Sequence, residues 1–238
     1  GLTIPLPFSP GRSGFTPAAA LTYDSGAGNG PCGVGWTISL PAITRRTDRG
    51  LPRYQDDTQS DVFLLSGTED LVPVLRPDGS VHEEPRGTSR VRRYRPRVEG
   101  LFARIERWTN EQDPTDVHWR SITRENVTTV YGTSPASRIA DPRDPARIVS
   151  WLVAETFDDR GNASIYDYVA EDGRDIDRAR PSEATRTDLD RSANRYLKRV
   201  RYGNRTSRLV APAGGNMQWL FELVVDYGDH DDQPSAEP

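Results

Sequence analysis

Side chains that could act as nucleophiles or metal ligands are scarce in this chain of 238 residues. Cys32 is the single cysteine, which excludes an internal disulfide and a cysteine-rich zinc site, and no histidine is placed near it to act as a base. We therefore expect Cys32 to be a small, buried or half-buried structural residue. His118 and the single lysine, Lys198, each alternate with their neighbours as strand residues do. This pattern favours cross-strand pairing over metal binding or Schiff-base chemistry.

A glycine-rich segment is the best candidate for cofactor binding. Residues 28–33 (GNGPCG) satisfy the dinucleotide fingerprint G-x-G-x-x-G. That fingerprint needs a following helix whose N-terminus holds the pyrophosphate, but residues 35–41 alternate in hydropathy and end in proline, as a strand does. A calcium loop that begins at Asp24 would place Gly26 and Gly28 where oxygen ligands are needed. We therefore predict no cofactor and no metal at this segment.

The same segment is better interpreted as a structural turn motif. Its residues are Tyr23, Asp24, Ser25, Gly26, Gly28, Asn29, Gly30, Gly33, Gly35 and Trp36. We expect the loop to be ordered without a ligand, with several glycines at positive φ, the backbone region that glycine enters at least cost. The glycines expected there are Gly26, Gly28, Gly30 and Gly33.

Residues 90–97 carry five arginines and one tyrosine in eight positions, the strongest local candidate for binding a phosphate backbone. Glu83, Glu84 and Glu99 flank this run, and the whole chain has 31 cationic and 35 acidic side chains, a net charge of −4. This balance favours a strand whose arginines are solvated or pair with carboxylates inside the molecule. It disfavours nucleic acid and anionic membranes as partners.

The elements that would position these residues are short strands. The chain contains 20 Gly and 19 Pro, which interrupt it too often for long helices. Runs rich in β-formers, bounded by Gly, Pro, Asp or Asn, predict strands over residues 19–23, 34–40, 61–65, 71–75, 101–108, 117–122, 126–131, 147–157, 163–169, 195–202 and 217–227. We predict an all-β, antiparallel fold, either a sandwich or an open meander, with little helix.

Connections between the strands carry explicit turn chemistry. Residues 77–79 (PDG) and 158–162 (DDRGN) predict hairpin turns, because Asp, Gly and Asn tolerate chain reversal and positive φ. Residues 171–193 are rich in Asp, Arg, Glu and Ser, which predicts an exposed charged insertion with one short helix near residues 183–191. We expect one β domain over residues 1–227, with a possible subdivision near 76–90, and an acidic tail or exit linker over 228–238.

Ten segments, in order along the chain, resemble the SpvB-like toxin family, the N-terminal regions of Salmonella virulence plasmid B proteins and of the B components of insecticidal toxin complexes. They are residues 10–15 (PGRSGF), 21–31 (LTYDSGAGNGP), 33–36 (GVGW), 43–54 (ITRRTDRGLPRY), 61–67 (DVFLLSG), 69–73 (EDLVP), 94–102 (YRPRVEGLF), 157–162 (FDDRGN), 193–205 (ANRYLKRVRYGNR) and 225–228 (VDYG). Cys32 departs from the family, which usually has an aromatic residue there.

The resemblance implies a non-catalytic, β-rich region of a secreted bacterial virulence toxin, which contributes to a hollow shell of strand repeats or precedes it. Residues 157–168 resemble one tyrosine-aspartate (YD) repeat. Implied partners are the rest of the toxin chain, a pore-forming A component and an effector-bearing C component, with no nucleic acid and no membrane insertion. The resemblance also implies secretion, although the chain shows no standard signal peptide and no run of about 18 apolar residues. A cytoplasmic location before release is an alternative that stays open.

Two alternatives stay open at this stage. In one branch of the family an actin-directed ADP-ribosyltransferase is joined to this region, but its chemistry needs a Glu-x-Glu pair and none occurs in the 238 residues. Such a catalytic domain would lie outside this chain. Alternatively, the domain binds carbohydrate or a host protein through exposed tryptophans. The five tryptophans, which we expect to be core or half-buried strand residues, are Trp36, Trp108, Trp119, Trp151 and Trp219.

Overall fold

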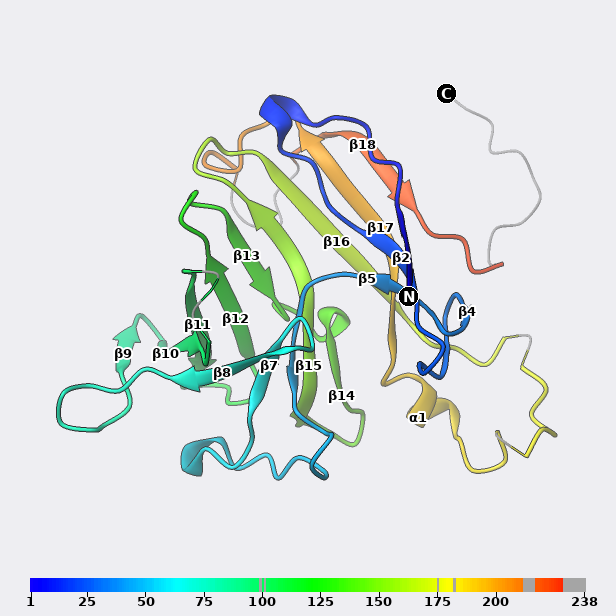
Figure 1. Ribbon diagram of the computed structural model, residues 1–238, viewed down its shortest axis with the longest axis horizontal. Coiled ribbons are helices and arrows are strands. Elements are labelled where there is room, and N and C mark those ends of the chain that lie inside the picture. Colours follow the sequence, from blue (N-terminus) through cyan, green and yellow to red (C-terminus); the bar gives the residue numbers. More distant parts are fainter. Residues whose placement is uncertain (99, 101, 175, 182, 212–216, 229–238) are drawn as a thin grey trace.

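The computed structural model describes residues 1–98, 100, 102–174, 176–181, 183–211 and 217–228. Its strands are β1 (Leu2–Pro5), β2 (Ala20–Tyr23), β3 (Asn29–Gly30), β4 (Gly33–Val34), β5 (Trp36–Ser39), β6 (Ala42–Arg45), β7 (Phe63–Leu65), β8 (Glu69–Pro73), β9 (Glu83–Arg86), β10 (Ser89–Pro96), β11 (Arg104–Asn110), β12 (Val117–Ile122), β13 (Thr128–Tyr131), β14 (Arg138–Asp141), β15 (Asp144–Phe157), β16 (Ala163–Ala170), β17 (Arg195–Asn204) and β18 (Trp219–Val224). Its helical turns are η1 (Arg12–Gly14), η2 (Asp56–Thr58), η3 (Pro135–Ser137) and α1 (Asp188–Arg191). All-β architecture with little helix is thus confirmed (Figure 1).

The largest sheet closes on itself as a barrel. Its strands follow the order β13, β12, β11, β10, β8, β7, β6 and β15, and β15 pairs again with β13 to complete the ring. All of these pairings are antiparallel. Closure is possible because β15 is 14 residues long and changes neighbours along its length. Ser150 to Leu152 pair with β6, whereas the residues from Val153 onward pair with β13.

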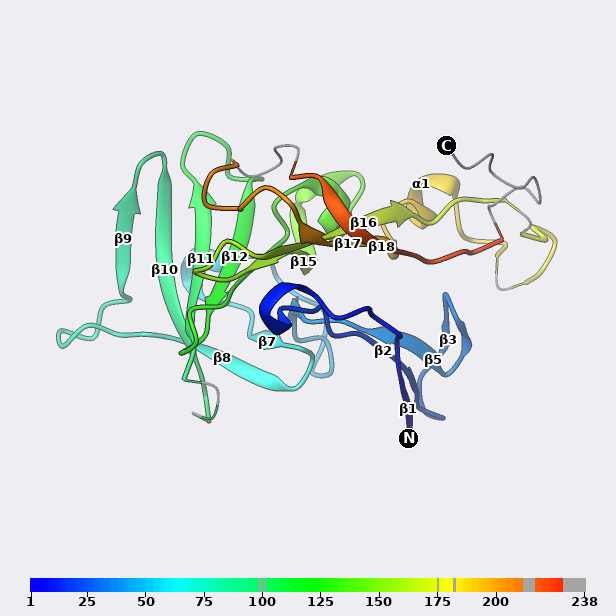
Figure 2. The same ribbon diagram turned by 90° about the horizontal axis from the view of Figure 1, so that it is seen from above.

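Beyond the barrel the same sheet continues as a flat arm. Strand β16 pairs with the end of β15, and β17 and β18 follow in antiparallel order. A separate three-stranded sheet, β1-β2-β5, lies against one face of this arm (Figure 2). The Phe8 and Tyr202 rings meet edge to face at 5.5 Å, and the Ser9 amide donates a 2.9 Å hydrogen bond to the Tyr202 hydroxyl. The N-terminal sheet is thereby docked on β17.

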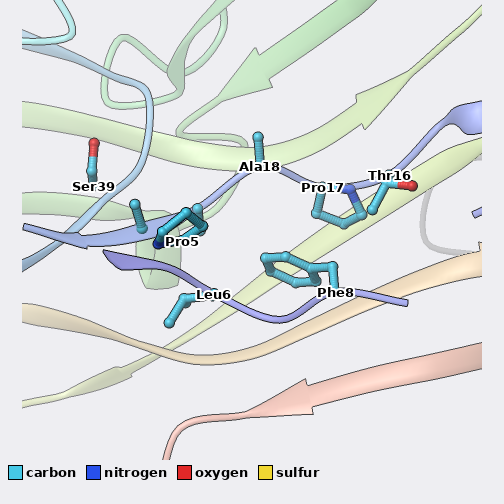
Figure 3. Close-up of a pocket in the computed structure, with 9 residues that line it drawn as sticks. Pro5, Leu6, Phe8, Thr16, Pro17, Ala18 and Ser39 are labelled. Carbon is cyan, nitrogen blue, oxygen red and sulfur yellow. The ribbon is translucent and has the colours of Figure 1, made fainter. Parts of the chain in front are cut away.

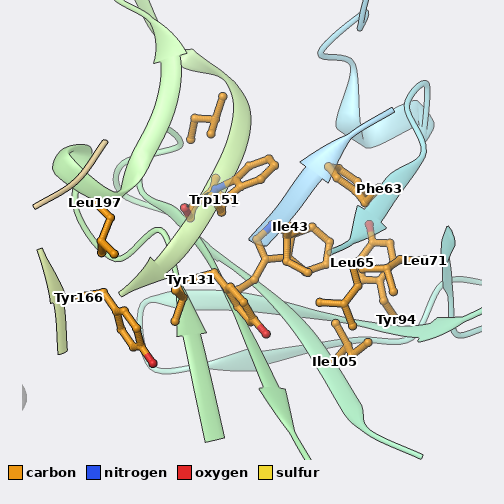
Figure 4. Close-up of a cluster of buried hydrophobic side chains, with 14 of the residues drawn as sticks. Ile43, Phe63, Leu65, Leu71, Tyr94, Ile105, Tyr131, Trp151, Tyr166 and Leu197 are labelled. Atoms are coloured by element: carbon orange, nitrogen blue, oxygen red, sulfur yellow. Dashed lines mark hydrogen bonds between the residues drawn. The ribbon is translucent and has the colours of Figure 1, made fainter. Parts of the chain in front are cut away.

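Aromatic side chains fill the barrel (Figure 4). The Phe63 ring lies 4.9 Å from that of Trp119 and 5.8 Å from that of Trp151, and both tryptophans are fully buried. The Trp151 indole NH donates to the Val117 carbonyl at 2.8 Å, which satisfies its one donor inside the core. The other three tryptophans are half-buried, so the expectation for all five is confirmed.

One end of the barrel holds charged groups out of contact with water. The Arg45 side chain is 1% exposed and donates to Asp56 and Asp61 at 2.8 Å each. Arg107, 7% exposed, donates to the same Asp56 carboxylate. A cation–π contact also holds the Arg45 side chain in place, because its guanidinium lies 4.9 Å from the centroid of the Phe63 ring. Asp56 belongs to η2, so this exposed turn is anchored to the interior of the barrel by buried ion pairs.

The strands and turns that were predicted are found in the structure, although some further strands were not predicted. Each of the eleven expected runs overlaps an observed strand, and the turn at 158–162 joins β15 to β16, with Gly161 at φ 81°. Residues 76–80 also form a tight reversal, since Leu75 and Val81 make an antiparallel bridge. Most described residues of 171–193 are exposed or half-buried as expected, and the helix there is shorter than predicted, Asp188–Arg191. The expected tail lies outside the described residues from 229 onward.

Candidate functional site

The glycine-rich motif folds as a small hairpin after β2. The Asp24 carboxylate accepts a 2.8 Å hydrogen bond from the Gly26 amide, and the Asp24 carbonyl accepts from Ala27 at 3.0 Å, so the chain turns around Asp24. Strands β3 and β4 then pair through the glycines at positions 30 and 33. The strand that follows, β5, carries Trp36, which confirms that no helix follows the fingerprint.

The glycines of this hairpin are needed for other reasons than the sequence suggested. Gly33 adopts φ 103° as expected, but Gly26, Gly28 and Gly30 do not have positive φ, so that prediction was wrong for three of the four. The physical reason is that the Asp24 side chain, rather than a left-handed backbone, makes the turn. Gly35 adopts φ 79°, and a Cβ there would lie 2.7 Å from the Tyr23 ring.

Of the ten motif residues, the structure brings Tyr23 and Trp36 together as paired rings, with centroids 5.1 Å apart. Asn29 and Gly30 face a cavity, and the other motif residues form the body of the hairpin. Cys32 is half-buried, as expected, and burial raises the pKa of its thiol. A raised pKa leaves less thiolate at neutral pH, so the thiol is a poor nucleophile.

Opposite the hairpin, residues from β16, β17 and the chain after β18 complete a cleft. One cavity of about 700 Å³ is lined by Asn29, Gly30, Glu171, Ile176, Asp177, Arg180, Glu183, Arg186, Asn194 and Tyr196. A second, of about 610 Å³, is lined by Pro31, Cys32, Val169, Ala170, Glu171, Asp172, Arg174, Ile176, Tyr196, Asp226, Tyr227 and Gly228. The two share Glu171, Ile176 and Tyr196, and we call them together the hairpin cleft.

Glu171 is the polar centre of the hairpin cleft. Its carboxylate accepts hydrogen bonds from Arg186 at 2.7 Å, from the Asn194 amide at 2.6 Å and from the Tyr196 hydroxyl at 2.8 Å. Burial, together with the hydrogen bond to Glu171 and its negative charge, raises the pKa of Tyr196 to about 12. A carboxylate held by three donors and a neutral phenol are suited to binding and positioning rather than to proton transfer at neutral pH.

Sequence reasoning missed Glu171, Asn194, Tyr196 and Tyr227 as a group. They come from the end of β16, the start of β17 and the residues after β18, separated by up to 56 positions, and no local motif links them. The available signal was weak. Tyr196 alternates with Lys198 in a strand-like run, whereas Glu171 begins a segment whose composition is that of an exposed loop.

A different hollow lies beside the N-terminal strand (Figure 3). It measures about 510 Å³ and is lined by Pro5, Leu6, Phe8, Thr16, Pro17, Ala18, Ala19, Ala20 and Ser39. This lining has no titratable side chain, so the hollow offers shape and apolar contact but no chemistry of acids, bases or nucleophiles.

Metal binding and membrane spanning find no support within the described ranges. No group of three or more His, Cys, Asp or Glu side chains there is close enough to hold an ion. His118 stacks on Trp108 with centroids 5.8 Å apart, and burial, with a smaller effect of Arg120, lowers its pKa to about 4. Its imidazole is therefore neutral at pH 7. Among these residues, no helix has the length and apolar character that crossing a bilayer requires.

The arginine-rich run lies in β10 up to Pro96, and several of its arginines pair inside the molecule, which is one of the two expected alternatives. Arg92 meets Glu83 at 2.5 Å, and Arg93 lies 3.3 Å from Glu84. Arg97 is 3.8 Å from Asp70. These carboxylates occupy guanidinium groups of Arg92, Arg93 and Arg97 that would otherwise be available to phosphates.

Titration of the chain with NAD or ATP is expected to give no saturable heat, because the glycine-rich hairpin leads into β5 instead of a helix. Isothermal titration calorimetry measures this directly. A micromolar dissociation constant that is lost in Gly30→Ala would contradict the structural interpretation, because a Cβ at position 30 would lie 2.7 Å from the Trp36 carbonyl and distort the loop.

Comparison with known proteins gives matches along the whole chain. The family model described as Salmonella virulence plasmid 65kDa B protein matches residues 1–238. The protein named mono(ADP-ribosyl)transferase SpvB from Salmonella typhimurium is 38% identical over 254 aligned residues, which cover 100% of this chain and 41% of that protein. The chain therefore spans less than half the length of the curated relatives that it matches.

Solved structures share the fold over the same length. The N-terminal domain of effector protein SpvB from Salmonella typhimurium strain LT2 superposes with a TM-score of 0.83 at 37% identity, covering 100% of this chain and 76% of that one. A chain of the Photorhabdus luminescens Tc holotoxin pore gives a TM-score of 0.80 at 34% identity, covering 97% of this chain and 11% of that one. A chain of the TcdB2-TccC3-Cdc42 crystal structure also gives 0.80 at 34%, with 98% and 11% covered.

Proposed function

Because the chain belongs to the Salmonella virulence plasmid 65kDa B protein family, we propose that it is a non-catalytic structural region of a bacterial toxin of the SpvB or toxin-complex B type. Its role is to build or brace the module that encapsulates or delivers a toxic effector. The observation that carries this proposal is its likeness, over 97% of its length, to 11% of a chain in a Tc holotoxin pore.

The physical character of the domain supports a bracing role. A closed barrel has no free strand edge in its ring, and the buried ion pairs of Arg45 and Arg107 fix η2 against it. The arm and the N-terminal sheet extend from this body as broad sheet surfaces (Figure 2). Such a body resists deformation and offers extended faces for neighbouring domains.

Catalysis belongs, in this proposal, to a segment outside the chain. The curated relatives carry the name of an ADP-ribosyltransferase, and this chain corresponds to 41% of their length and to an N-terminal domain. The chain lacks Glu-x-Glu, and the half-buried carboxylate of its cleft, Glu171, is held by three donors. Partners are then the rest of the toxin chain and the other toxin-complex subunits, and the place of action is outside the producing cell.

Deletion of this region from the parent toxin should abolish delivery into target cells or solubility, while the freed effector keeps its activity in a cell extract. The reason is that the region supplies structure and no reacting group. Delivery is measured by intoxication of intact cells, and effector activity is measured in lysate from the same cells.

The matched control is a parent toxin that retains the region with Arg178→Ser, an exposed position on the insertion. It should deliver as the unmodified toxin does. If the deletion instead removed activity in extract while delivery stayed intact, the region would be part of the catalytic unit and the proposal would be wrong.

A further inference from the structure

Two tyrosine rings give the hairpin cleft a feature that a scaffold does not require. Tyr196 and Tyr227 both line its 610 Å³ cavity, and their ring centroids lie 5.8 Å apart with planes inclined at 47°. Both residues are half-buried, so part of each ring is open to the cleft. The Tyr227 hydroxyl donates to the Leu197 carbonyl at 2.8 Å, which fixes this ring against β17. The pair offers pre-positioned apolar faces next to polar groups.

Polar groups surround these rings on both walls. On the arm side stand Glu171 and Asn194, and Asn29 faces the adjoining cavity from the hairpin side. An ionised carboxylate has about four acceptor positions, and three of those on Glu171 are used by Arg186, Asn194 and Tyr196. One acceptor position therefore remains for a donor on a ligand, and the carboxylate is already oriented by its neighbours.

Charges around the hairpin cleft are already matched in pairs. Arg186 lies 2.7 Å from Glu171, Arg174 lies 2.7 Å from Asp172, and Arg180 lies 3.8 Å from Asp177. A charged ligand would have to compete with these internal partners, so the charged side chains around the hairpin cleft would contribute little to its binding free energy. An uncharged ligand with hydroxyl groups and apolar C–H faces does not compete with these ion pairs, so its binding free energy is not reduced by them.

We propose that the hairpin cleft is a binding site for a neutral carbohydrate. One sugar ring packs its C–H face on Tyr227 and Tyr196, and its hydroxyls bond with Glu171 and the amides of Asn194 and Asn29. Cavities of about 610 and 700 Å³ fall within the usual size range of small-ligand sites, about 300–1,000 Å³, and accommodate a short oligosaccharide. This site goes beyond the scaffold role and does not depend on it.

The test is titration of the chain with three neutral trisaccharides, maltotriose, cellotriose and triacetylchitotriose, followed by NMR and by intrinsic fluorescence. At least one is expected to give a saturable change with a dissociation constant of about 0.1–10 mM, the range of a shallow site with few hydrogen bonds. Tyr227→Ala should weaken that binding at least about tenfold, whereas Tyr227→Phe, which keeps the ring, should retain most of it. Circular dichroism and thermal unfolding confirm that each variant is folded.

Phe102→Ala is the matched aromatic control, because this ring is 61% exposed and lies outside the hairpin cleft. Its affinity for the saccharide should equal that of the unmodified chain. The proposal is overturned if none of the three saccharides gives a saturable change up to about 50 mM, or if Tyr227→Ala binds as well as Tyr227→Phe. Binding only of an anionic sugar, such as a heparin disaccharide, with an affinity that falls as salt rises, would overturn it as well.

Discussion

Replacement of Asp56 by alanine is expected to lower the free energy of unfolding by about 3–5 kcal/mol, as loss of one partner from a buried ion pair does. Asp56 accepts from Arg45 and from Arg107, whose side chains are 1% and 8% exposed. Without Asp56, Arg45 keeps Asp61, but Arg107 loses its carboxylate in a site where water does not replace it. Equilibrium unfolding in urea measures the loss, with an unchanged slope showing that the denatured state is the same.

The control is Asp57→Ala in the same short turn. Asp57 is 87% exposed and lies 3.8 Å from Arg90, so its loss should change stability by no more than about 0.5 kcal/mol. Equal effects of the two substitutions would show that η2 contributes through its backbone and that the buried ion pairs are unimportant.

The lowered pKa of Asp56 predicts how the free energy of unfolding depends on pH. Burial alone would raise the pKa of Asp56, but the hydrogen bond from Arg45 and the charge of Arg107 outweigh it, so the folded-state pKa lies below the ordinary value. A group with a lowered pKa stabilises the fold above its unfolded pKa of about 3.9, and this contribution is lost as pH falls through the folded-state value. Unmodified protein should therefore lose more stability below about pH 4 than Asp56→Ala does.

Gly132→Ala should destabilise the barrel by about 2–5 kcal/mol. Gly132 has φ 67°, where an alanine costs about 1–2 kcal/mol, and its new Cβ would lie 2.3 Å from Cδ1 of the Trp151 ring. That ring is fully buried and cannot move aside, so overpacking adds about 1–3 kcal/mol. Urea unfolding again measures the change.

Gly67→Ala separates the two contributions. Gly67 has φ 76°, but a Cβ at this position would meet no atom within 4 Å, so only the backbone cost remains, about 1–2 kcal/mol. Equal losses for the two alanines would mean that the Trp151 ring adapts to the new methyl group, contrary to the packing described.

Local patterns were enough to place most strands but not to join them. The run at 117–122 begins with alternating apolar and polar residues and is β12 with the expected bounds, because every second residue of it is buried. Strands β1, β6, β9 and β14 were missed, since each has only four residues and contains or adjoins a proline. Closure of the barrel could not be predicted from the sequence. It depends on β13 pairing with β15, and the hydropathy of neither strand specifies its neighbour.

The burial of charged residues is harder to predict from the sequence than that of apolar ones. Arginine is a residue type that is mostly exposed, yet Arg107 is buried because Asp56 reaches it from a turn 51 positions away. Glu171 is hidden in the same way by donors from α1's segment and β17. Burial of such groups is a property of the assembled partners, which a sequence pattern does not record.

Strand β15 belongs to the barrel and to the arm at once, with no linker between them. A joint that could bend would need several consecutive unpaired residues, but between Ser150 and Phe157 every residue except Ala154, which lies at a register shift opposite Val130 and Tyr131, pairs with a neighbouring strand. The arm is therefore rigidly joined to the barrel, and a force applied to β18 is transmitted to the barrel strands through the hydrogen bonds of the continuous sheet. Amide protons on both sides should consequently exchange in one cooperative opening, rather than in two separate ones.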